Sequence, residues 1–257
     1  MRNTSLILSV LLFCPQTQVT QPAPGTKRDP QALAVLSSAY GATSGAALML
    51  AKDTSSEMML VAPTDEQASS GTVLLKTMGK GVWKAEADTL DGASVLVLNG
   101  SQGMSQSRSD QQSFLTISIA EAGNWFLPAY SIIGEYADPS LNISYLGLEG
   151  STHHIQLLRT STDPTLQEVL SPCDVYIDSA TSLPFRLTYF LHPPADLKIR
   201  IPAQVEYSDY RAVSGVLLPY DVKFSIRGKL IAEYKLSSFT ANVGLSPSEF
   251  SVTAGAL

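Results

Sequence analysis

The sequence predicts an α+β protein: one large, curved antiparallel sheet, an unclosed half-barrel with two helical segments on its concave face. Most of the chain alternates apolar and polar residues with the period of two that is typical of strands with one buried and one wet face. Turn signals separate these stretches, and only two segments have helical spacing. An antiparallel sheet of about ten strands accumulates twist until it curls, splits or closes.

The N-terminus has the pattern of a secretory signal. Met1 and Arg2 precede a short apolar run at 6–13, and a polar stretch rich in proline follows. We therefore expect residues 1–25 to be a signal peptide and linker, residues 26–257 to form a single domain, and the protein to be periplasmic or secreted. Cys14 directly follows the apolar run, so the alternative is a lipid anchor through an acylated Cys14. Without Cys14, Cys173 is a lone thiol and is expected to be a small buried apolar residue.

The first predicted helix begins at Pro30. Asp29 is a good N-cap, Pro30 suits the first helical position, and Gly41 is a stop signal. Leu33 and Leu36 recur at helical spacing before this stop. We expect the helix to end at Tyr40.

The second predicted helix extends from Asn124 to Tyr136. Phe126, Tyr130 and Ile133 lie at helical spacing within it, and Pro128 must then occupy its first turn. We expect this helix to lie across the sheet.

Twelve segments are strand candidates. Between Trp83 and Asp88, for example, apolar and charged residues alternate strictly, and Asn99-Gly100 is a strong hairpin signal. Short connections favour a meander over crossover connections. The candidates are residues 57–62, 71–77, 82–89, 94–99, 113–119, 142–149, 153–159, 173–178, 184–191, 198–213, 217–227 and 229–240.

Two helices rarely fill the concave side of a large curled sheet, which predicts an apolar cavity beneath them. The alternative is a concave side packed solid with the protein's own side chains. Large apolar residues are candidates for lining a lipid groove, and each could instead belong to an ordinary core. The candidates are Trp83, Trp125, Phe126, Tyr130, Ile133 and Phe224.

The C-terminal third contains three recognisable motifs. An Asp-centred hairpin, Val-Tyr-Ile-Asp at 175–178, leads to Thr-Ser-Leu-Pro-Phe-Arg at 181–186. Tyr-Ser-Asp-Tyr-Arg at 207–211 leads to Gly-Val-Leu-Leu-Pro-Tyr at 215–220, and Asn-Val-Gly-Leu follows at 242–245. Over residues 173–250 the chain resembles the LolA/LolB-like family of periplasmic lipoprotein carriers.

The resemblance implies an unclosed antiparallel barrel that holds acyl chains beneath its helices. Burial of each methylene contributes about 0.8 kcal/mol, so a dry groove can extract a lipid without covalent chemistry. Carriers of this family tend to have a polar or basic residue near the cavity mouth, and Arg108, Arg159 and Arg186 are candidates here.

The sequence gives little support to nucleic-acid binding, metal binding or catalysis. The net charge of −6 and the lack of a basic block argue against nucleic-acid binding. His153 and His154 are neighbours in a predicted strand and point to opposite faces, so we expect no metal site. The chain has no Gly-x-Ser-x-Gly motif and no recognisable pair of catalytic carboxylates, and no cofactor is expected.

These observations predict a non-enzymatic, monomeric envelope protein that binds a lipid, a lipoprotein acyl group or another apolar ligand. A first alternative is an envelope sensor or scaffold of the same fold that binds a protein partner. A second is an enzyme that acts on a small apolar substrate, which the absence of an acid, base or nucleophile set disfavours.

Overall fold

The computed structural model describes residues 26–63, 69–79, 81–90, 92–108, 110–122 and 125–251, with the backbone alone described at Ser69, Ala122 and Tyr130. The predicted signal peptide, Cys14 and Asn124 lie outside these residues. No helix in the described ranges has the length and apolar character needed to cross a membrane.

Thirteen antiparallel strands form a single sheet in the order β6-β5-β4-β3-β2-β1-β13-β12-β11-β10-β9-β8-β7. The α+β class and the large antiparallel sheet are therefore confirmed. The strands are β1 (Asp53–Ala62), β2 (Ser69–Met78), β3 (Val82–Thr89), β4 (Gly92–Asn99), β5 (Gln102–Ser107), β6 (Gln111–Leu115), β7 (Asn142–Glu149), β8 (Thr152–Leu158), β9 (Cys173–Asp178), β10 (Pro184–Leu191), β11 (Ile201–Val213), β12 (Val216–Ile226) and β13 (Lys229–Ala241).

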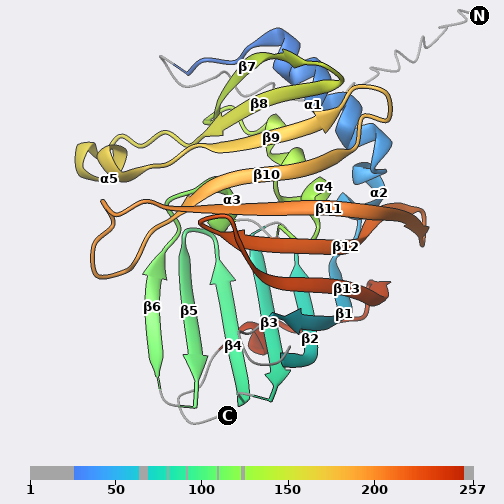
Figure 1. Ribbon diagram of the computed structural model, residues 1–257, viewed down its shortest axis with the longest axis vertical. Coiled ribbons are helices and arrows are strands. Elements are labelled where there is room, and N and C mark those ends of the chain that lie inside the picture. The colour runs from blue at the N-terminus through green and yellow to red at the C-terminus, as the bar shows by residue number, and fades with distance from the viewer. Residues whose placement is uncertain are drawn as a thin grey trace, which may run out of the picture.

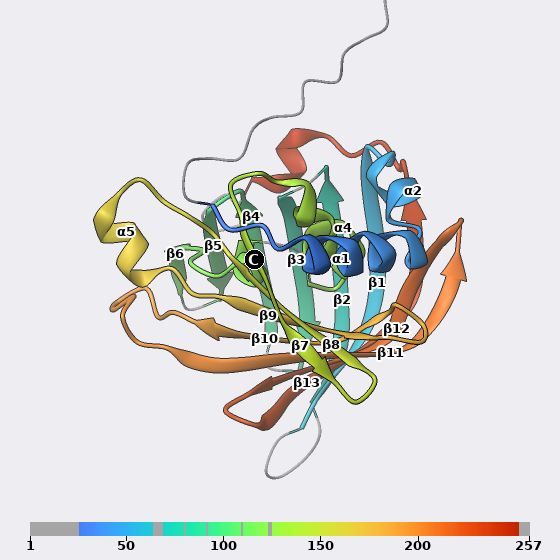
Figure 2. The ribbon, with the colours of Figure 1, turned by 90° about the horizontal axis from the view of Figure 1, so that it is seen from above.

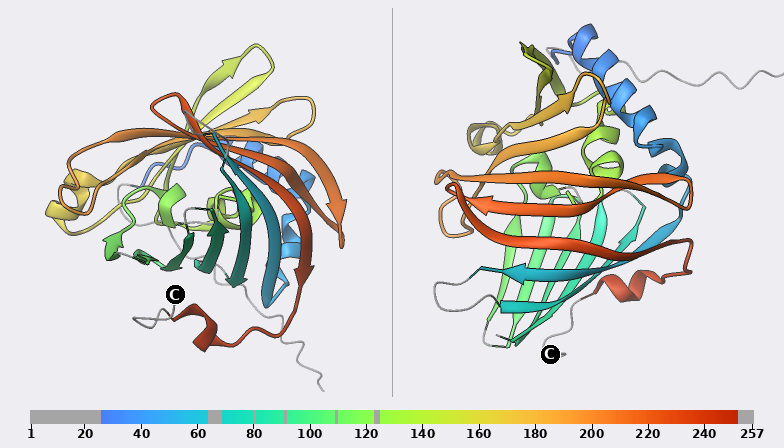
Figure 3. Two further views of the ribbon diagram at one scale, coloured as in Figure 1. Left: turned by 60° about the horizontal axis from the view of Figure 1, so that its bottom comes forward. Right: turned by 45° about the vertical axis from the view of Figure 1, so that its right-hand side comes forward.

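The sheet consists of two meanders joined by one long-range pairing. Strands β1 to β6 form the first meander, β7 to β13 form the second, and β1 pairs with β13, placing Leu60 opposite Tyr234. The two meanders run across each other in Figure 1, and the sheet arches over a hollow without closing in the left view of Figure 3. The edges of the arch are β6 and β7, so the unclosed half-barrel is confirmed.

Helices occupy the hollow beneath this arch. In Figure 2, α1 and α4 lie between the two halves of the sheet. The chain between β6 and β7 connects the two sheet edges and contributes α3, α4 and η1. The helices are α1 (Pro30–Ala42), α2 (Gly45–Met49), α3 (Ile119–Ala122), α4 (Pro128–Ser131), α5 (Pro164–Val169) and the 3₁₀ helices η1 (Ile133–Ala137) and η2 (Pro247–Phe250).

Helix α1 starts as the sequence predicts. The Asp29 carboxylate accepts hydrogen bonds from the backbone N–H groups of Gln31 and Ala32 at 2.9 and 3.2 Å, and Pro30 is the first helical residue. The helix continues through Gly41 to Ala42. The expected end at Tyr40 is therefore wrong by two residues, because helix packing in the hollow outweighs the weak stop signal of one glycine.

The second predicted helix is not continuous. Pro128 begins α4, the backbone changes direction at Ile132 (φ −112°, ψ −58°), and η1 follows. Consecutive side chains on a regular helix point about 100° apart. Ile132 and Ile133 are both fully buried, and the break lets both reach the core.

Three strand predictions need correction, and one strand was missed. The predicted strand 57–62 begins four residues earlier, at Asp53. The predicted strand 113–119 ends at Leu115, and residues 119–122 form α3 instead, because the Glu121 carboxylate accepts hydrogen bonds from two backbone N–H groups before the helix. Strand β5 was not predicted, since it is polar apart from one methionine and contains Gly103. The predicted strand 198–213 starts only at Ile201, after a turn around Asp196.

The core has two main parts. The half of the arch formed by β7 to β12 is packed against α1 and η1 around fully buried residues such as Leu36 and Ile155. The half formed by β1 to β4 has a smaller cluster that includes Trp83 and Phe126. Trp125 packs against both clusters. The half of the arch formed by β7 to β12 is therefore filled by helices, and we call it the filled half. The half formed by β1 to β4 is only partly covered.

Candidate functional site

A cavity of about 380 Å³ lies under the partly covered half of the arch. Its walls come from β1 to β6 and β13 and from the two aromatic residues that precede α4. The apolar lining includes Leu60, Val73, Trp83, Leu96, Trp125 and Phe126, and the polar lining includes Ser94, Ser105, Ser107, Asp110 and Gln112. The cavity is thus apolar inside, with its polar residues towards the outer strands β4 to β6.

An aromatic cluster forms one wall of the cavity and separates it from the filled half. Trp125 stacks on Phe126 with ring centroids 3.9 Å apart and on Phe224 at 5.4 Å. The Tyr234 ring meets Phe126 edge-on at 4.8 Å. The Tyr207 hydroxyl donates a 2.7 Å hydrogen bond to the backbone carbonyl of Trp125, which fixes this segment against β11. The wall is therefore held by stacking from one side and by a hydrogen bond from the other.

The cavity is electrostatically suited to apolar ligands. Burial raises the pKa of Tyr234 to about 12, so its phenol stays neutral at physiological pH. Among the lining residues that the structure describes, Asp110 alone carries a charge. Trp83 is 4% exposed, and its buried Nε1 has no hydrogen-bond partner among the described residues. Desolvation here penalises charged ligand groups and favours hydrocarbon.

The structure brings three of the six predicted site residues together. Trp83, Trp125 and Phe126 line the cavity. Phe224 supports Trp125 from the filled half without lining the cavity. Ile133 is fully buried in the filled half. The side chain of the sixth, Tyr130, lies outside the described residues.

The three candidate arginines lie in different places. Arg108 comes directly after Ser107, which lines the cavity, and its side chain lies close to Gly92. Arg186 lies over the ring of Tyr176 at 3.9 Å, far along the sheet on β10. Arg159 is half-buried after β8, where desolvation lowers its pKa. Only Arg108 is near the cavity.

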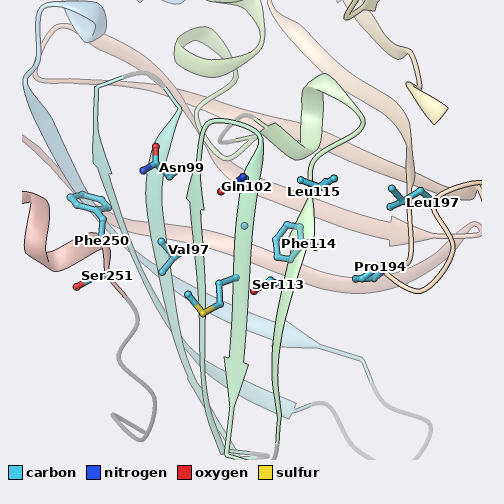
Figure 4. A pocket seen from close by; sticks show the side chains of 12 residues that line it. Val97, Asn99, Gln102, Ser113, Phe114, Leu115, Pro194, Leu197, Phe250 and Ser251 are labelled. Carbon is cyan, nitrogen blue, oxygen red and sulfur yellow. The ribbon is translucent and has the colours of Figure 1, made fainter. Parts of the chain in front are cut away.

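Two larger hollows lie on the outer face of the sheet. One of about 610 Å³ spans β4 to β6 between Phe250 at one end and Pro194 and Leu197 at the other (Figure 4). Another of about 680 Å³ lies over β1 to β4 and is bordered by three carboxylates. Their size alone does not make them better lipid sites, because each includes strongly exposed apolar residues: Leu115 is 43% and Met59 45% exposed, whereas Phe126 in the cavity is 7% exposed.

A buried serine–histidine pair is the group closest to catalytic chemistry that sequence reasoning missed. The Ser171 hydroxyl lies 2.7 Å from His192 Nε2, and His192 Nδ1 lies 2.7 Å from the carbonyl oxygen of Leu197. Because a carbonyl only accepts, Nδ1 carries the proton and Nε2 can accept from Ser171. Ser171 is completely buried, so no substrate reaches its hydroxyl, and the pair instead ties the β10–β11 loop to the segment before β9.

The described residues contain no cluster of three or more potential metal ligands. His153 lies 2.9 Å from the Tyr145 hydroxyl, while His154 lies on the other face of β8, 3.2 Å from Asp174. The two imidazoles therefore do not converge, as expected for neighbours in a strand.

The sequence analysis missed most of the other lining residues, among them Leu60, Val73 and Tyr234. Tyr234 alternates with charged neighbours in the sequence, which indicates its buried face. Leu60 and Val73 instead lie in runs of consecutive apolar residues, where alternation indicates no face. What was not visible is that β1 pairs with β13, which brings Leu60 beside Tyr234 and both beside Phe126.

An unclosed antiparallel half-barrel with an apolar cavity under its arch defines the fold class of this protein. Within it, the chain is similar to solved structures of LolA-type proteins. A LolA superfamily protein from Nitrosomonas europaea matches with a TM-score of 0.53 at 11% identity, over 86% of this chain and 97% of that one. A putative outer membrane lipoprotein-sorting protein domain from Vibrio parahaemolyticus matches with a TM-score of 0.51 at 12% identity, over 84% and 97%.

A DUF1329 family protein from Desulfovibrio piger has the same fold, with a TM-score of 0.54 at 12% identity over 88% of this chain and 98% of that one. No protein-family model matches the chain, and no curated protein does. The chain therefore has the LolA-like fold, which confirms the resemblance found in the C-terminal motifs at the level of architecture.

Proposed function

We propose that the protein is a non-enzymatic, carrier-like protein of the cell envelope that binds a lipid, a lipoprotein acyl group or another apolar ligand. The observation that carries this proposal is the apolar cavity of about 380 Å³ under the partly covered half of the arch. Similarity to a putative lipoprotein-sorting domain and to a LolA superfamily protein supports it.

Binding in this cavity needs no covalent step. Each methylene moved from water into the cavity contributes about 0.8 kcal/mol. The wall of Trp125, Phe126 and Tyr234 offers aromatic surface, and the neutral phenol of Tyr234 adds no charge. The buried position of Ser171 argues against hydrolysis at the serine–histidine pair.

The location and partners follow from the same proposal. A protein exported by the predicted signal would be periplasmic or secreted, act as a monomer and receive its ligand from a membrane or an acylated protein. Acylation of Cys14 would instead tether it to a membrane. A sensor or scaffold that binds a protein segment in the cavity is the competing proposal.

A phenylalanine introduced on β3 should fill the cavity at one position and leave it open at the neighbouring position. Ala85 lines the cavity, while Lys84, the preceding residue on β3, faces outward and pairs with Glu86 at 2.6 Å. We expect Ala85→Phe to weaken binding of a fluorescent fatty acid by about tenfold or more, because it displaces several methylenes. Lys84→Phe adds the same ring outside the cavity and should bind like the wild type.

Two readouts make the result decisive. Both tryptophans of the chain, Trp83 and Trp125, line the cavity, so their emission should shift to the blue when an apolar ligand displaces water. Mass spectrometry of extracts from purified protein that was incubated with membrane lipids should recover a bound lipid. If the wild type binds neither probe nor lipid, the proposal fails; recovery of a stable protein partner without lipid favours the scaffold.

A further inference from the structure

The cavity continues beyond its aromatic end as a small second void of about 10 Å³. On three strands, the residue that lines this void lies two positions along from the residue that lines the cavity, on the same inner face. The pairs are Leu60 and Met58 on β1, Val73 and Leu75 on β2, and Tyr234 and Leu236 on β13. Two residues of an antiparallel strand span about 6.8 Å. The void therefore continues the cavity along these strands, two residues further along each of them.

Two side chains separate the cavity from the void. Phe126 and Tyr234 line both spaces, and their rings meet edge-on, 4.8 Å apart at 86°. Phe126 comes from the segment that crosses the hollow, whereas Tyr234 belongs to the sheet. Trp125 stacks on Phe126 at 3.9 Å and also meets the Tyr234 ring edge-on at 5.7 Å, so these contacts hold the Phe126 ring across the path.

We propose that Phe126 sets the depth of the cavity and thereby the longest apolar chain that the protein accommodates. This inference rests on the proposed function. A hydrocarbon chain lying along β1 and β2 meets the Phe126 ring before it reaches Leu75. Chains that fit before the ring gain affinity with each methylene, and longer chains leave their additional methylenes in water.

The test uses saturated fatty acids of increasing length, from octanoate to stearate, in competition with a bound fluorescent fatty acid. For the wild type, affinity should rise about fourfold per methylene up to a limiting length and then level off. Phe126→Ala joins the cavity to the void. It should move this limit by two or more methylenes, so that the longest chains bind ~15-fold more tightly than to the wild type.

Phe224 provides a matched control. It belongs to the same aromatic cluster and stacks on Trp125 at 5.4 Å, but it lines neither the cavity nor the void. Phe224→Ala removes the same atoms and should keep the wild-type length limit, whatever its effect on overall affinity. Phe126→Leu removes less volume and should shift the limit by less, and it serves if Phe126→Ala does not fold.

An unchanged limit in both Phe126 variants overturns the inference, as does an equal shift in Phe224→Ala. Either result leaves the proposed function intact, because the wild type still binds fatty acids. A wild type that binds none of them overturns the proposed function, and the inference with it.

Discussion

Polar side chains on the inner face of the sheet differ in whether they have partners. Thr54 and Thr77 lie on neighbouring strands, and their hydroxyls are 2.7 Å apart in a fully buried pair. Ser56, two residues along β1, is equally buried, but its hydroxyl has no partner among the described residues. A buried hydroxyl without a hydrogen bond costs free energy, whereas a paired one is roughly neutral or favourable.

This difference predicts opposite effects on stability. Ser56→Ala removes an unpaired hydroxyl and should leave the free energy of unfolding unchanged or raise it by up to about 1 kcal/mol. Thr77→Val keeps the shape but leaves the Thr54 hydroxyl unpaired, and should lower it by about 1–3 kcal/mol. Urea denaturation of the two variants measures both effects. Equal destabilisation by the two substitutions would show that the two hydroxyls have equivalent environments.

At the scale of elements, the C-terminal segment after β13 is attached to the sheet by one carboxylate. Asp53, at the start of β1, is 5% exposed. It accepts hydrogen bonds from the backbone N–H groups of Val243 at 2.6 Å, and of Gly244 and Leu245 at 3.2 Å. The segment then continues to η2, where Glu249 pairs with Lys76 of β2 at 3.0 Å. A carboxylate that receives several N–H groups is a strong local anchor.

Removing this anchor should release the segment without unfolding the sheet. Asp53→Ala is expected to lower the free energy of unfolding by about 2 kcal/mol, since hydrogen bonds to charged groups contribute about 1.5–3 kcal/mol and the freed N–H groups regain water. Hydrogen exchange at Val243, Gly244 and Leu245 should accelerate. Asp53→Asn keeps one acceptor oxygen and should have a smaller effect. Unchanged exchange in Asp53→Ala would mean that the Lys76–Glu249 pair alone holds the segment.

The elements that the sequence predicted well have their determinants close together in the chain. Asp29 caps α1 two and three residues away, and Asp178 stabilises the β9–β10 turn by accepting hydrogen bonds from the backbone of Ala180 and Thr181. Strand β5 was missed because the contact that favours it is made with another strand, β6. Gly103 permits the ring of Phe114 to lie on it, and a Cβ atom there would be 2.3 Å from that ring.

At the scale of the whole molecule, a hydrogen-bond network links the segment after β6 to residues beside β9 and β10. Glu121 of α3 accepts hydrogen bonds from Ile117 and Ser118 and, at 3.3 Å, from the backbone N–H of His192 after β10. Ser118 also bridges to Ser171, which lies before β9. The segment that leaves one sheet edge is thereby fastened to the other half of the sheet.

This network should make stability depend on pH. Burial raises the pKa of Glu121 above its ordinary value of 4.5, against the opposing effect of its N–H donors and of His192. The folded protein therefore holds this proton more tightly than the unfolded chain does. The resulting stabilisation is fully present below about pH 4.5 and is lost as the pH rises through the folded-state pKa.

Glu121→Gln removes this titration. The free energy of unfolding of the wild type minus that of the variant should fall as the pH rises from about 4 to about 8. Chemical denaturation across this range measures the difference. A difference that rises with pH would mean that the backbone hydrogen bonds to the carboxylate outweigh its desolvation.

The sequence by itself determined most of the antiparallel strands, the start of α1 and several turns, because period-two alternation, caps and turn residues act over a few neighbouring residues. It also offered Trp83, Trp125 and Phe126 as candidates for a lipid groove or an ordinary core, and all three line the cavity. Only the tertiary structure decided that Tyr234 joins them while Ile133 is buried in the filled half. The position of Tyr234 depends on the pairing of β1 with β13, and the position of Ile133 depends on the break at Ile132 between α4 and η1. Both features arise from packing between residues that are distant in the chain.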